Sequence, residues 1–284
     1  MRQEVLPLLV FQTDFTYKEG AVAAMYGVVR SISRDVEIIT ATHEIPQYDI
    51  WSASYRLQQY VEFWPKGTVF VSVVDPGVGT SRKACVALTE TGYYIVTPDN
   101  GALTHVKKKH GIKEIREIDE SINRLKNTKG TSVFHGRDLF GYTAARLASG
   151  LITYEQVGKE YSVDEVVTLE IPEFEVKEGY LKGIIEIDDP NFGNCWSNIP
   201  VEEVFNAGFE YGQDLLITIT KNGRKLYHQV TRFDKTFGNV KKGDPILYNN
   251  ELMNVSLALS QENFMEKYKV YFGPDYIIEI RGEK

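Results

Sequence analysis

Residues 69–82 read VFVSVVDPGVGTSR, and this stretch decides how the first half of the chain folds. Residues 69–74 are a nearly continuous apolar run, which is typical of a strand buried in a parallel sheet. Asp75-Pro76-Gly77 then forms a turn sequence, because proline fixes φ and glycine accepts positive φ. A buried strand that ends in a polar turn is a repeating unit of α/β proteins, so we expect that class here.

The same alternation continues on both sides of this stretch. Further strands are predicted at residues 7–11, 36–40, 84–88 and 93–96, and helices at 21–32, 50–64 and 137–149. Asp49 is the expected N-cap of the second helix, and Gly150 ends the third. Strands that alternate with helices predict a mostly parallel sheet flanked by helices.

The second half of the chain has a different pattern. From about residue 181 the apolar runs are short and rich in β-branched residues, as in GIIEI, LLITIT and YIIEI. Asn222-Gly223 separates two such runs, which is a strong hairpin signal. We therefore expect a smaller C-terminal antiparallel β-barrel or sandwich. Residues 165–178 are the expected linker, and the expected domains are residues 1–170 and 171–284.

Composition excludes several classes of protein. The 284 residues have a formal net charge of -7, whereas nucleic-acid-binding domains usually carry a basic surface. No apolar stretch approaches the roughly 20 residues that a membrane span needs. The two cysteines lack a metal-binding spacing and fit a reducing compartment. We expect a cytoplasmic protein with neither a nucleic-acid nor a membrane partner.

Three carboxylates follow predicted strands. Asp75 comes directly after one, Asp14 and Asp99 follow three residues after the ends of two others, and the carboxyl ends of parallel strands meet at one edge of a sheet. Ligands bind at that edge in open α/β sheets, so the sequence predicts a site there. Because Asp-Pro-Gly and Pro-Asp-Asn-Gly are also turn formers, a purely structural interpretation of each motif stays open.

The segment FHGRD at residues 134–138 precedes the third predicted helix. A helix N-terminus favours anions, which suits His135 to a reaction centre, although a polar residue near a cap is the alternative. A metal site made by His135, Asp138 and Asp75 matches no standard ligand spacing, so no metal is expected. Gly77-Val78-Gly79 does not complete the Gly-x-Gly-x-x-Gly motif of dinucleotide-binding proteins, because Arg82 stands where the third glycine would be.

The segment DPNFGNCW at residues 189–196 interrupts the β pattern of the second half. Its asparagine, aspartate and aromatic side chains suit ligand binding, and an ordinary hairpin loop is the alternative.

Taken together, these motifs resemble the S-adenosyl-L-methionine (SAM) hydrolases of the adenosine-forming type, also called SAM hydroxide adenosyltransferases, which are relatives of fluorinase and chlorinase. The motifs occur in the family's order: QTDF at 12–15, VDPGVGTSR at 74–82, TPDNG at 97–101, FHGRD at 134–138 and DPNFGNCW at 189–196.

The resemblance implies an N-terminal α/β domain, a C-terminal β-barrel and a homotrimer whose active sites lie between neighbouring subunits. It implies Asp75, Arg82 and His135 as the residues that activate water, without a cofactor. The implied substrate contacts are Asp14 on the ribose hydroxyls, Tyr48 beside the sugar, Asp189 on the methionine amino group, Asn194 and Trp196 on the adenine and methionine portions, and Phe237, Asn250 and Glu251 on the same two portions.

This chain departs from the family near its C-terminus. It has NNELM at residues 249–253 where the family has Asn-Ser-x-Gly, so the resemblance assigns no residue to the methionine carboxylate. The expected reaction is hydrolysis of SAM to adenosine and L-methionine. Two alternatives stay open: a SAM-dependent halogenase, and a non-catalytic sensor that binds SAM or adenosine.

Overall fold

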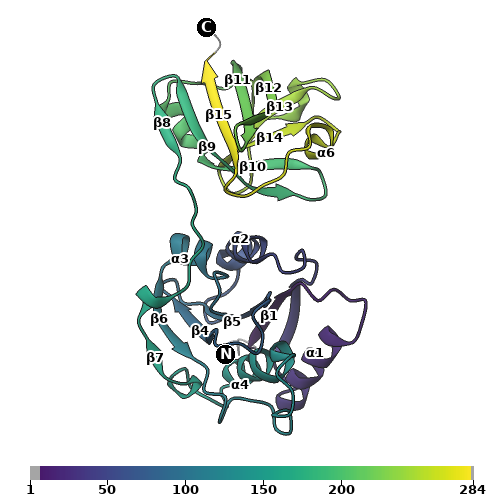
Figure 1. Cartoon of the computed structure of the whole chain (residues 1–284), viewed down its shortest axis with the longest axis vertical. Helices are drawn as coiled ribbons and strands as arrows, with labels where there is room; N and C mark the ends of the chain where they lie inside the picture. The colour runs from purple at the N-terminus through teal and green to yellow at the C-terminus, as the bar shows by residue number, and fades with distance from the viewer. Residues whose placement is uncertain (1–6, 283–284) are drawn as a thin grey trace, which may run out of the picture. The chain divides into compact units, whose positions relative to one another are not determined.

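The structure is a computed structural model that describes residues 7–282. The chain divides into two compact units, Met1–Leu169 and Glu170–Lys284, which are described separately. Figure 1 shows a unit of strands and helices followed by a unit made mainly of strands. Residues 1–6 and 283–284, at the ends of the two expected domains, lie outside the described residues. The domain ranges 1–170 and 171–284 therefore stay a prediction.

The first unit contains a seven-stranded sheet in the order β2-β1-β3-β5-β4-β6-β7. Strands β1, β2, β3 and β5 pair in parallel, and β4, β6 and β7 continue the sheet in antiparallel pairs. The strands are β1 (Leu8–Thr13), β2 (Glu37–Thr42), β3 (Val69–Val73), β4 (Ala84–Thr89), β5 (Tyr94–Pro98), β6 (Ile112–Glu117) and β7 (Glu160–Tyr161). The expected α/β class is confirmed, and the sheet is mixed, with three parallel and three antiparallel pairings.

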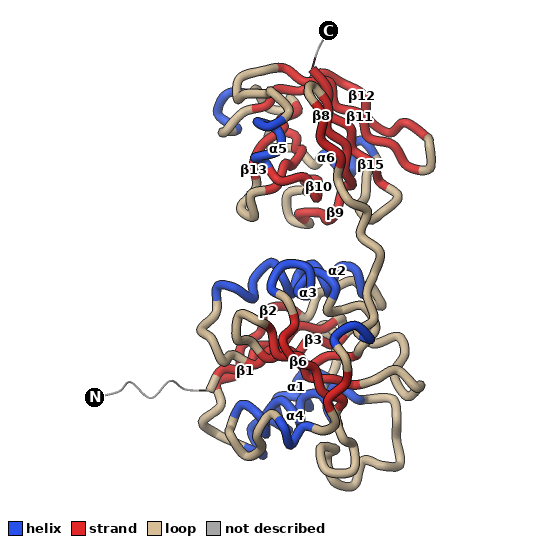
Figure 2. Tube along the Cα trace, turned by 90° about the vertical axis from the view of Figure 1, so that its left-hand side faces the viewer, coloured by secondary structure: helices blue, strands red, loops and turns tan. Residues whose placement is uncertain are grey.

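Helices cover both faces of this sheet, as Figure 2 shows. Successive residues of a strand point to opposite faces. Leu9 and Phe11 of β1 pack in one buried cluster with α1 (Ala21–Ile32) and α4 (Tyr142–Ala148). Val10, between them, packs in another cluster with α2 (Ile50–Tyr60) and α3 (Thr104–His110). The short 3₁₀ turns of the unit are η1 (Val61–Phe63), η3 (Glu155–Val157) and η4 (Val163–Glu165).

Two predicted helix ends are informative. Asp49 is confirmed as the N-cap of α2, because its side chain accepts a hydrogen bond of 2.9 Å from the backbone nitrogen of Ser52. The helix predicted at 137–149 instead begins with the π-helical turn η2 (Gly136–Gly141), and α4 follows it. π-Helical turns occur often at functional sites, and this one directly follows His135.

The second unit is a closed β-barrel. Strands β10, β14, β13, β12, β11, β15 and β9 pair in that order, and β9 pairs with β10 to close the ring. The strands are β8 (Glu175–Lys177), β9 (Tyr180–Asp189), β10 (Asn194–Pro200), β11 (Asp214–Lys221), β12 (Arg224–Phe233), β13 (Pro245–Asn249), β14 (Asn254–Leu259) and β15 (Tyr276–Gly282). The helical segments are α5 (Val201–Asn206), η5 (Phe237–Asn239) and α6 (Phe264–Tyr268). Of the two expected architectures, the barrel is confirmed.

In the second half of the chain the predicted hairpin is confirmed, whereas the predicted linker differs from the structure. Asn222 and Gly223 have φ of 48° and 78° and join β11 to β12, as the hairpin signal predicted. The predicted linker at 165–178 is too long, because β8 lies within it and pairs with β9. Gly179, with φ of 70°, makes the tight turn between these strands. Within residues 7–282, no helix is long and apolar enough to cross a membrane.

Candidate active site

The three carboxylates at the strand ends lie at one edge of the sheet, as predicted. Asp14, Asp75 and Asp99 follow or end the parallel strands β1, β3 and β5. Asp99 has a structural role. Its two carboxylate oxygens accept hydrogen bonds of 2.9 Å, one from the Tyr161 hydroxyl and one from the Val167 backbone nitrogen. Asp14 and Asp75 are therefore the two carboxylates of this edge that can meet a ligand.

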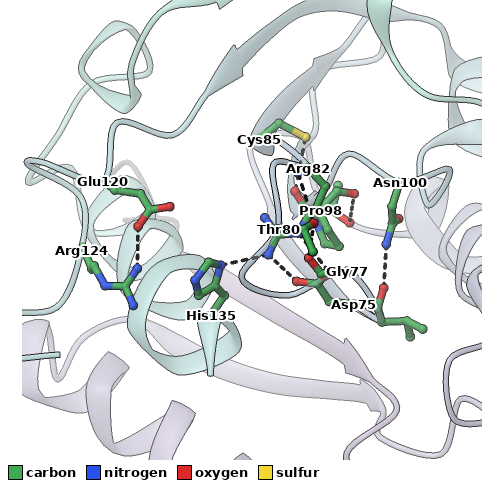
Figure 3. Close-up of polar contacts among 12 residues, drawn as sticks. Asp75, Gly77, Thr80, Arg82, Cys85, Pro98, Asn100, Glu120, Arg124 and His135 are labelled. Carbon is green, nitrogen blue, oxygen red and sulfur yellow. Dashed lines mark hydrogen bonds and ion pairs between the residues drawn. The ribbon is translucent and has the colours of Figure 1, made fainter. Parts of the chain in front are cut away.

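Arg82 joins Asp75 to His135 (Figure 3). Its Nε donates a hydrogen bond of 2.9 Å to Oδ1 of Asp75, and its Nη2 pairs with Oδ2 of the same carboxylate. The same Nη2 lies 2.9 Å from Nδ1 of His135. Both members of the ion pair are nearly buried, so the two-point contact holds the Asp75 carboxylate in one orientation. The three residues predicted to be catalytic are therefore linked through Arg82.

This contact determines which nitrogen of His135 is protonated. A guanidinium has only donors, so Nδ1 must accept from Arg82, and the proton of a neutral imidazole is then on Nε2. Burial, and after it the positive charge of Arg82, lower the pKa of His135. His135 is therefore neutral near pH 7, with a hydrogen-bond donor at Nε2.

Asp75 also lines a cavity of about 720 Å³ at the strand ends. The lining residues are Asp14, Phe15, Glu19, Gly20, Ala21, Ala24, Gln47, Tyr48, Asp75, Val133, Phe134 and Arg137. Arg82 and His135 are not among these described lining residues; Arg82 contacts Asp75 directly, and His135 contacts Arg82. The cavity brings the predicted residues Asp14, Tyr48 and Asp75 together.

Asp14 and Tyr48 are held together by a backbone contact. Oδ2 of Asp14 accepts a hydrogen bond of 3.0 Å from the backbone nitrogen of Tyr48. Tyr48 has a φ of 65°, a left-handed conformation that is rare for a bulky residue and is often found at functional sites. Burial raises the pKa of Asp14, and the hydrogen bond from Tyr48 acts in the opposite direction.

His43 fixes the turn that carries Asp14, and sequence reasoning did not identify it. Its Nδ1 lies 2.8 Å from the Thr13 hydroxyl oxygen, and its carbonyl oxygen accepts a hydrogen bond of 2.9 Å from the Thr16 backbone nitrogen. Thr16 has a φ of 57°, which is unusual for a β-branched residue. His43 thus contacts the chain before Asp14, at Thr13, and after it, at Thr16. Burial lowers the pKa of His43 to about 4.

The predicted residues of the second unit form a separate group. Asn194 donates a hydrogen bond of 3.2 Å to Oδ2 of Asp189, across the β9–β10 turn. DPNFGNCW is thus a hairpin, and Asn194 and Phe237 line a cavity of about 770 Å³ in the barrel unit. A hairpin and a ligand site are therefore compatible interpretations of this segment.

The other three predicted residues differ in their surroundings. Trp196 is buried on β10, two residues after Asn194, and Glu251 is exposed in the β13–β14 turn. Asn250 is buried, and its side chain bonds to the Ser256 hydroxyl and to the backbone nitrogens of Leu252 and Asn254. Its amide therefore stabilises the turn, and a contact to substrate stays a prediction.

Several cavity residues were not predicted from the sequence. They are Phe15, Glu19, Gln47, Phe134 and Arg137. Phe15, Phe134 and Arg137 lie within quoted motifs, so their positions in the sequence were a usable signal. Gln47 had no such signal. Within residues 7–282, no group of three or more His, Cys, Asp or Glu side chains could hold a metal ion.

The fold and the site define a class of protein: an α/β unit with a buried carboxylate–guanidinium–imidazole group beside a cavity at the strand ends, followed by a β-barrel. Residues 9–158 match the SAM hydroxide adenosyltransferase N-terminal domain, and residues 183–276 match the C-terminal domain of the same family. The chain belongs to the SAM hydroxide adenosyltransferase family.

Individual relatives are similar to this protein over nearly the whole chain. The chain is 35% identical to an (R)-S-adenosyl-L-methionine hydrolase of Methanocaldococcus jannaschii, over 99% of this chain and 97% of that protein. It is 26% identical to a fluorinase of Actinopolyspora mzabensis, over 94% and 95%. A crystal structure of an uncharacterized conserved protein from Thermotoga maritima superimposes with a TM-score of 0.86 at 32% identity, covering 96% of this chain and 99% of that one.

Proposed function

We propose that this protein hydrolyses SAM to adenosine and L-methionine. The observation that carries the proposal is the Asp75 carboxylate, which lines the cavity and is held at two points by Arg82. The 35% identity to an enzyme named (R)-S-adenosyl-L-methionine hydrolase supports the same reaction.

The reaction needs a nucleophile more than it needs an acid. Water attacks the 5′ carbon, the bond from that carbon to sulfur breaks, and its electron pair stays on sulfur. The sulfonium leaves as the neutral thioether of methionine, so no general acid is required. Bulk water has a pKa of about 15.7, so the proton that it loses must be accepted and its developing charge stabilised.

The contacts suggest a division of roles within the trio. Asp75 lies at the cavity wall, so it is the group that accepts a hydrogen bond from the attacking water and receives its proton. Arg82 orients Asp75 and contributes positive charge in a dry site, where electrostatic effects are large. His135 accepts from Arg82 through Nδ1, and so it orients the guanidinium rather than serving as the base.

Asp14 would fix the substrate by accepting hydrogen bonds from the ribose hydroxyls, with Tyr48 beside the sugar. Both line the same cavity as Asp75, which supports an in-line approach of water to the 5′ carbon. Asp189, Asn194, Trp196, Phe237, Asn250 and Glu251 are proposed contacts to the adenine and methionine portions, from the family resemblance.

We also propose a homotrimer with active sites at subunit interfaces. Tyr48 and Val133 beside the first cavity are 69% and 77% exposed, and Phe192 beside the barrel cavity is 69% exposed. Exposed apolar side chains at a cavity rim are typical of surfaces that another chain covers. A cytoplasmic location is proposed as well, supported by two buried free thiols.

The decisive experiment is incubation of the purified protein with SAM in water labelled with heavy oxygen. Adenosine and methionine should form in equal amounts, with the label in the adenosine hydroxyl because water attacks the 5′ carbon. Label in neither product, or a product other than adenosine, would overturn the proposal.

A halogenase is the second candidate, because fluorinases are relatives of this chain. Asp75 opposes it, since a carboxylate beside the nucleophile repels halide ions. Incubation with SAM and chloride followed by mass spectrometry separates the two, as a chlorinase forms chlorodeoxyadenosine. A non-catalytic sensor would bind SAM and release no adenosine.

A further inference from the structure

Arg137 lies at the cavity wall with part of its guanidinium unused. Its Nε donates a hydrogen bond of 2.6 Å to Oδ1 of Asp138, and its Cζ lies 5.0 Å from the centre of the Phe134 ring. In the part of the chain that the structure describes, neither Nη atom has a hydrogen-bond partner. The side chain is 30% exposed and lines the same cavity as Asp14 and Asp75.

The contact with Asp138 is not a full two-point ion pair. Oδ2 of Asp138 is buried and, within the described residues, has no partner, although an Nη group of Arg137 would be expected to satisfy it. The guanidinium is therefore turned away from Oδ2, with only its Nε edge on the carboxylate. This orientation leaves both Nη groups for another ligand.

The guanidinium is also held in place. Asp138 is fully buried, and its backbone nitrogen donates to the Phe134 carbonyl oxygen at 3.0 Å. The Phe134 ring beneath Arg137 packs edge-on against Phe15, the residue after Asp14. A planar donor fixed in this way loses little entropy when it binds an anion.

Charge indicates what the anion is. Among the described residues that line the cavity, Arg137 is the one basic side chain, and Asp14, Glu19 and Asp75 are acidic. SAM carries a positive sulfonium, which suits the acidic part, and its amino-acid portion ends in a carboxylate. Two parallel N–H groups of a guanidinium match the two oxygens of a carboxylate.

We propose that Arg137 binds the α-carboxylate of the substrate's methionine portion through its two Nη groups and so selects carboxylate-bearing sulfonium nucleosides. This inference rests on the proposed function and adds to it a residue for the substrate group that the family resemblance left unassigned.

The test compares SAM with decarboxylated SAM, which keeps the sulfonium, the adenosine and the amine but lacks the carboxylate. In Arg137→Gln, kcat/KM for SAM should fall roughly 10- to 100-fold, as expected for lost hydrogen bonds to a charged group. The value for decarboxylated SAM should change less than about threefold, because the deleted groups have no partner there. The preference of the native protein for SAM should therefore largely disappear, and Arg137→Lys should retain part of it.

Arg116→Gln is the matched control. Arg116 is a mostly buried arginine of the same unit that pairs with Glu114 and does not line the cavity. It should leave the ratio of the two kcat/KM values unchanged, whatever it does to thermal stability. Equal losses on both substrates in Arg137→Gln would mean a structural role and would overturn the proposal.

Calorimetric titration of both compounds separates this inference from the proposed function. If the native protein binds SAM without hydrolysing it, the proposed function fails, yet the affinity ratio still tests Arg137. An affinity ratio that is the same in the native protein, Arg137→Gln and Arg137→Lys would overturn the carboxylate role even if hydrolysis occurs.

Discussion

Nη2 of Arg82 lies 2.9 Å from Nδ1 of His135, although 53 residues separate them in the chain. Because Arg82 also holds both oxygens of Asp75, the proposed mechanism has the imidazole orient Arg82, which in turn orients Asp75. The contact makes His135 an acceptor toward Arg82 and argues against a role as general base.

This arrangement predicts different tolerances within the trio. Asp75→Asn should lower kcat about 10²- to 10⁴-fold, because an amide cannot receive the water proton. His135→Asn should retain much more activity than His135→Leu, since an amide oxygen can still accept from Arg82. Steady-state kinetics with SAM test both, and calorimetry should find adenosine affinity nearly unchanged. Equal and large losses in His135→Asn and His135→Leu would instead identify the imidazole as the base.

Asp14 should contribute to binding more than to chemistry. Asp14→Ala removes both the ribose contact and the acceptor for the Tyr48 backbone nitrogen, so KM for SAM and Kd for adenosine should rise roughly 10- to 100-fold. Asp14→Asn keeps an acceptor oxygen and should show the smaller effect. Unchanged adenosine affinity in Asp14→Ala, measured by calorimetry, would contradict the ribose assignment.

His43 should make the stability of the protein depend on pH. Burial lowers its pKa from the ordinary value of 6.5 to about 4, so between these values the unfolded chain binds more protons than the folded one. The free energy of unfolding should therefore be unaffected by His43 above pH 6.5 and should fall as pH decreases toward 4, by at most about 3 kcal/mol. Chemical denaturation at a series of pH values measures this.

His43→Asn should flatten that pH dependence, because an amide does not titrate. The exposed His228, which contacts Thr218 on the barrel, supplies the control variant His228→Asn, and its stability profile should follow the native one. Since His43 also holds the turn of Asp14, His43→Asn should raise KM for SAM more than it lowers kcat. A pH profile as steep as that of the native protein would show that other groups cause the acid loss.

Two glycine substitutions should have opposite effects on stability. A Cβ at Gly136 would lie 2.9 Å from Phe15 and 3.3 Å from Phe134, so Gly136→Ala should push these rings apart and lower both Tm and activity. Gly27 is exposed within α1 and has open space where its Cβ would be, so Gly27→Ala should add about 0.5–1 kcal/mol to the free energy of unfolding. Thermal melts of both variants check the pair, and a destabilised Gly27→Ala would contradict this account of the helix.

Much of the fold was predictable because local sequence patterns encode it. Apolar runs, a capping aspartate at position 49 and the Asn222-Gly223 turn act over a few residues, and each produced the expected element. The antiparallel direction of β4, the strands β6, β7 and β8 and the π-helical turn after His135 depend on pairing and packing with distant residues, and no local pattern predicted them.

The candidate site divides in the same way. By itself the sequence determined that Asp14 and Asp75 meet at one sheet edge, because parallel strands align their carboxyl ends, and its motifs indicated the trio. Only the tertiary structure decided that Asp75 lines the cavity, that Arg82 connects it to His135, and that His43 holds the Asp14 turn. The tertiary structure also decided that Arg137 donates to Asp138 through Nε alone, which leaves its two Nη groups for a ligand. The positions of the strands depend on short-range periodicity, whereas the direction of a side chain depends on what packs around it.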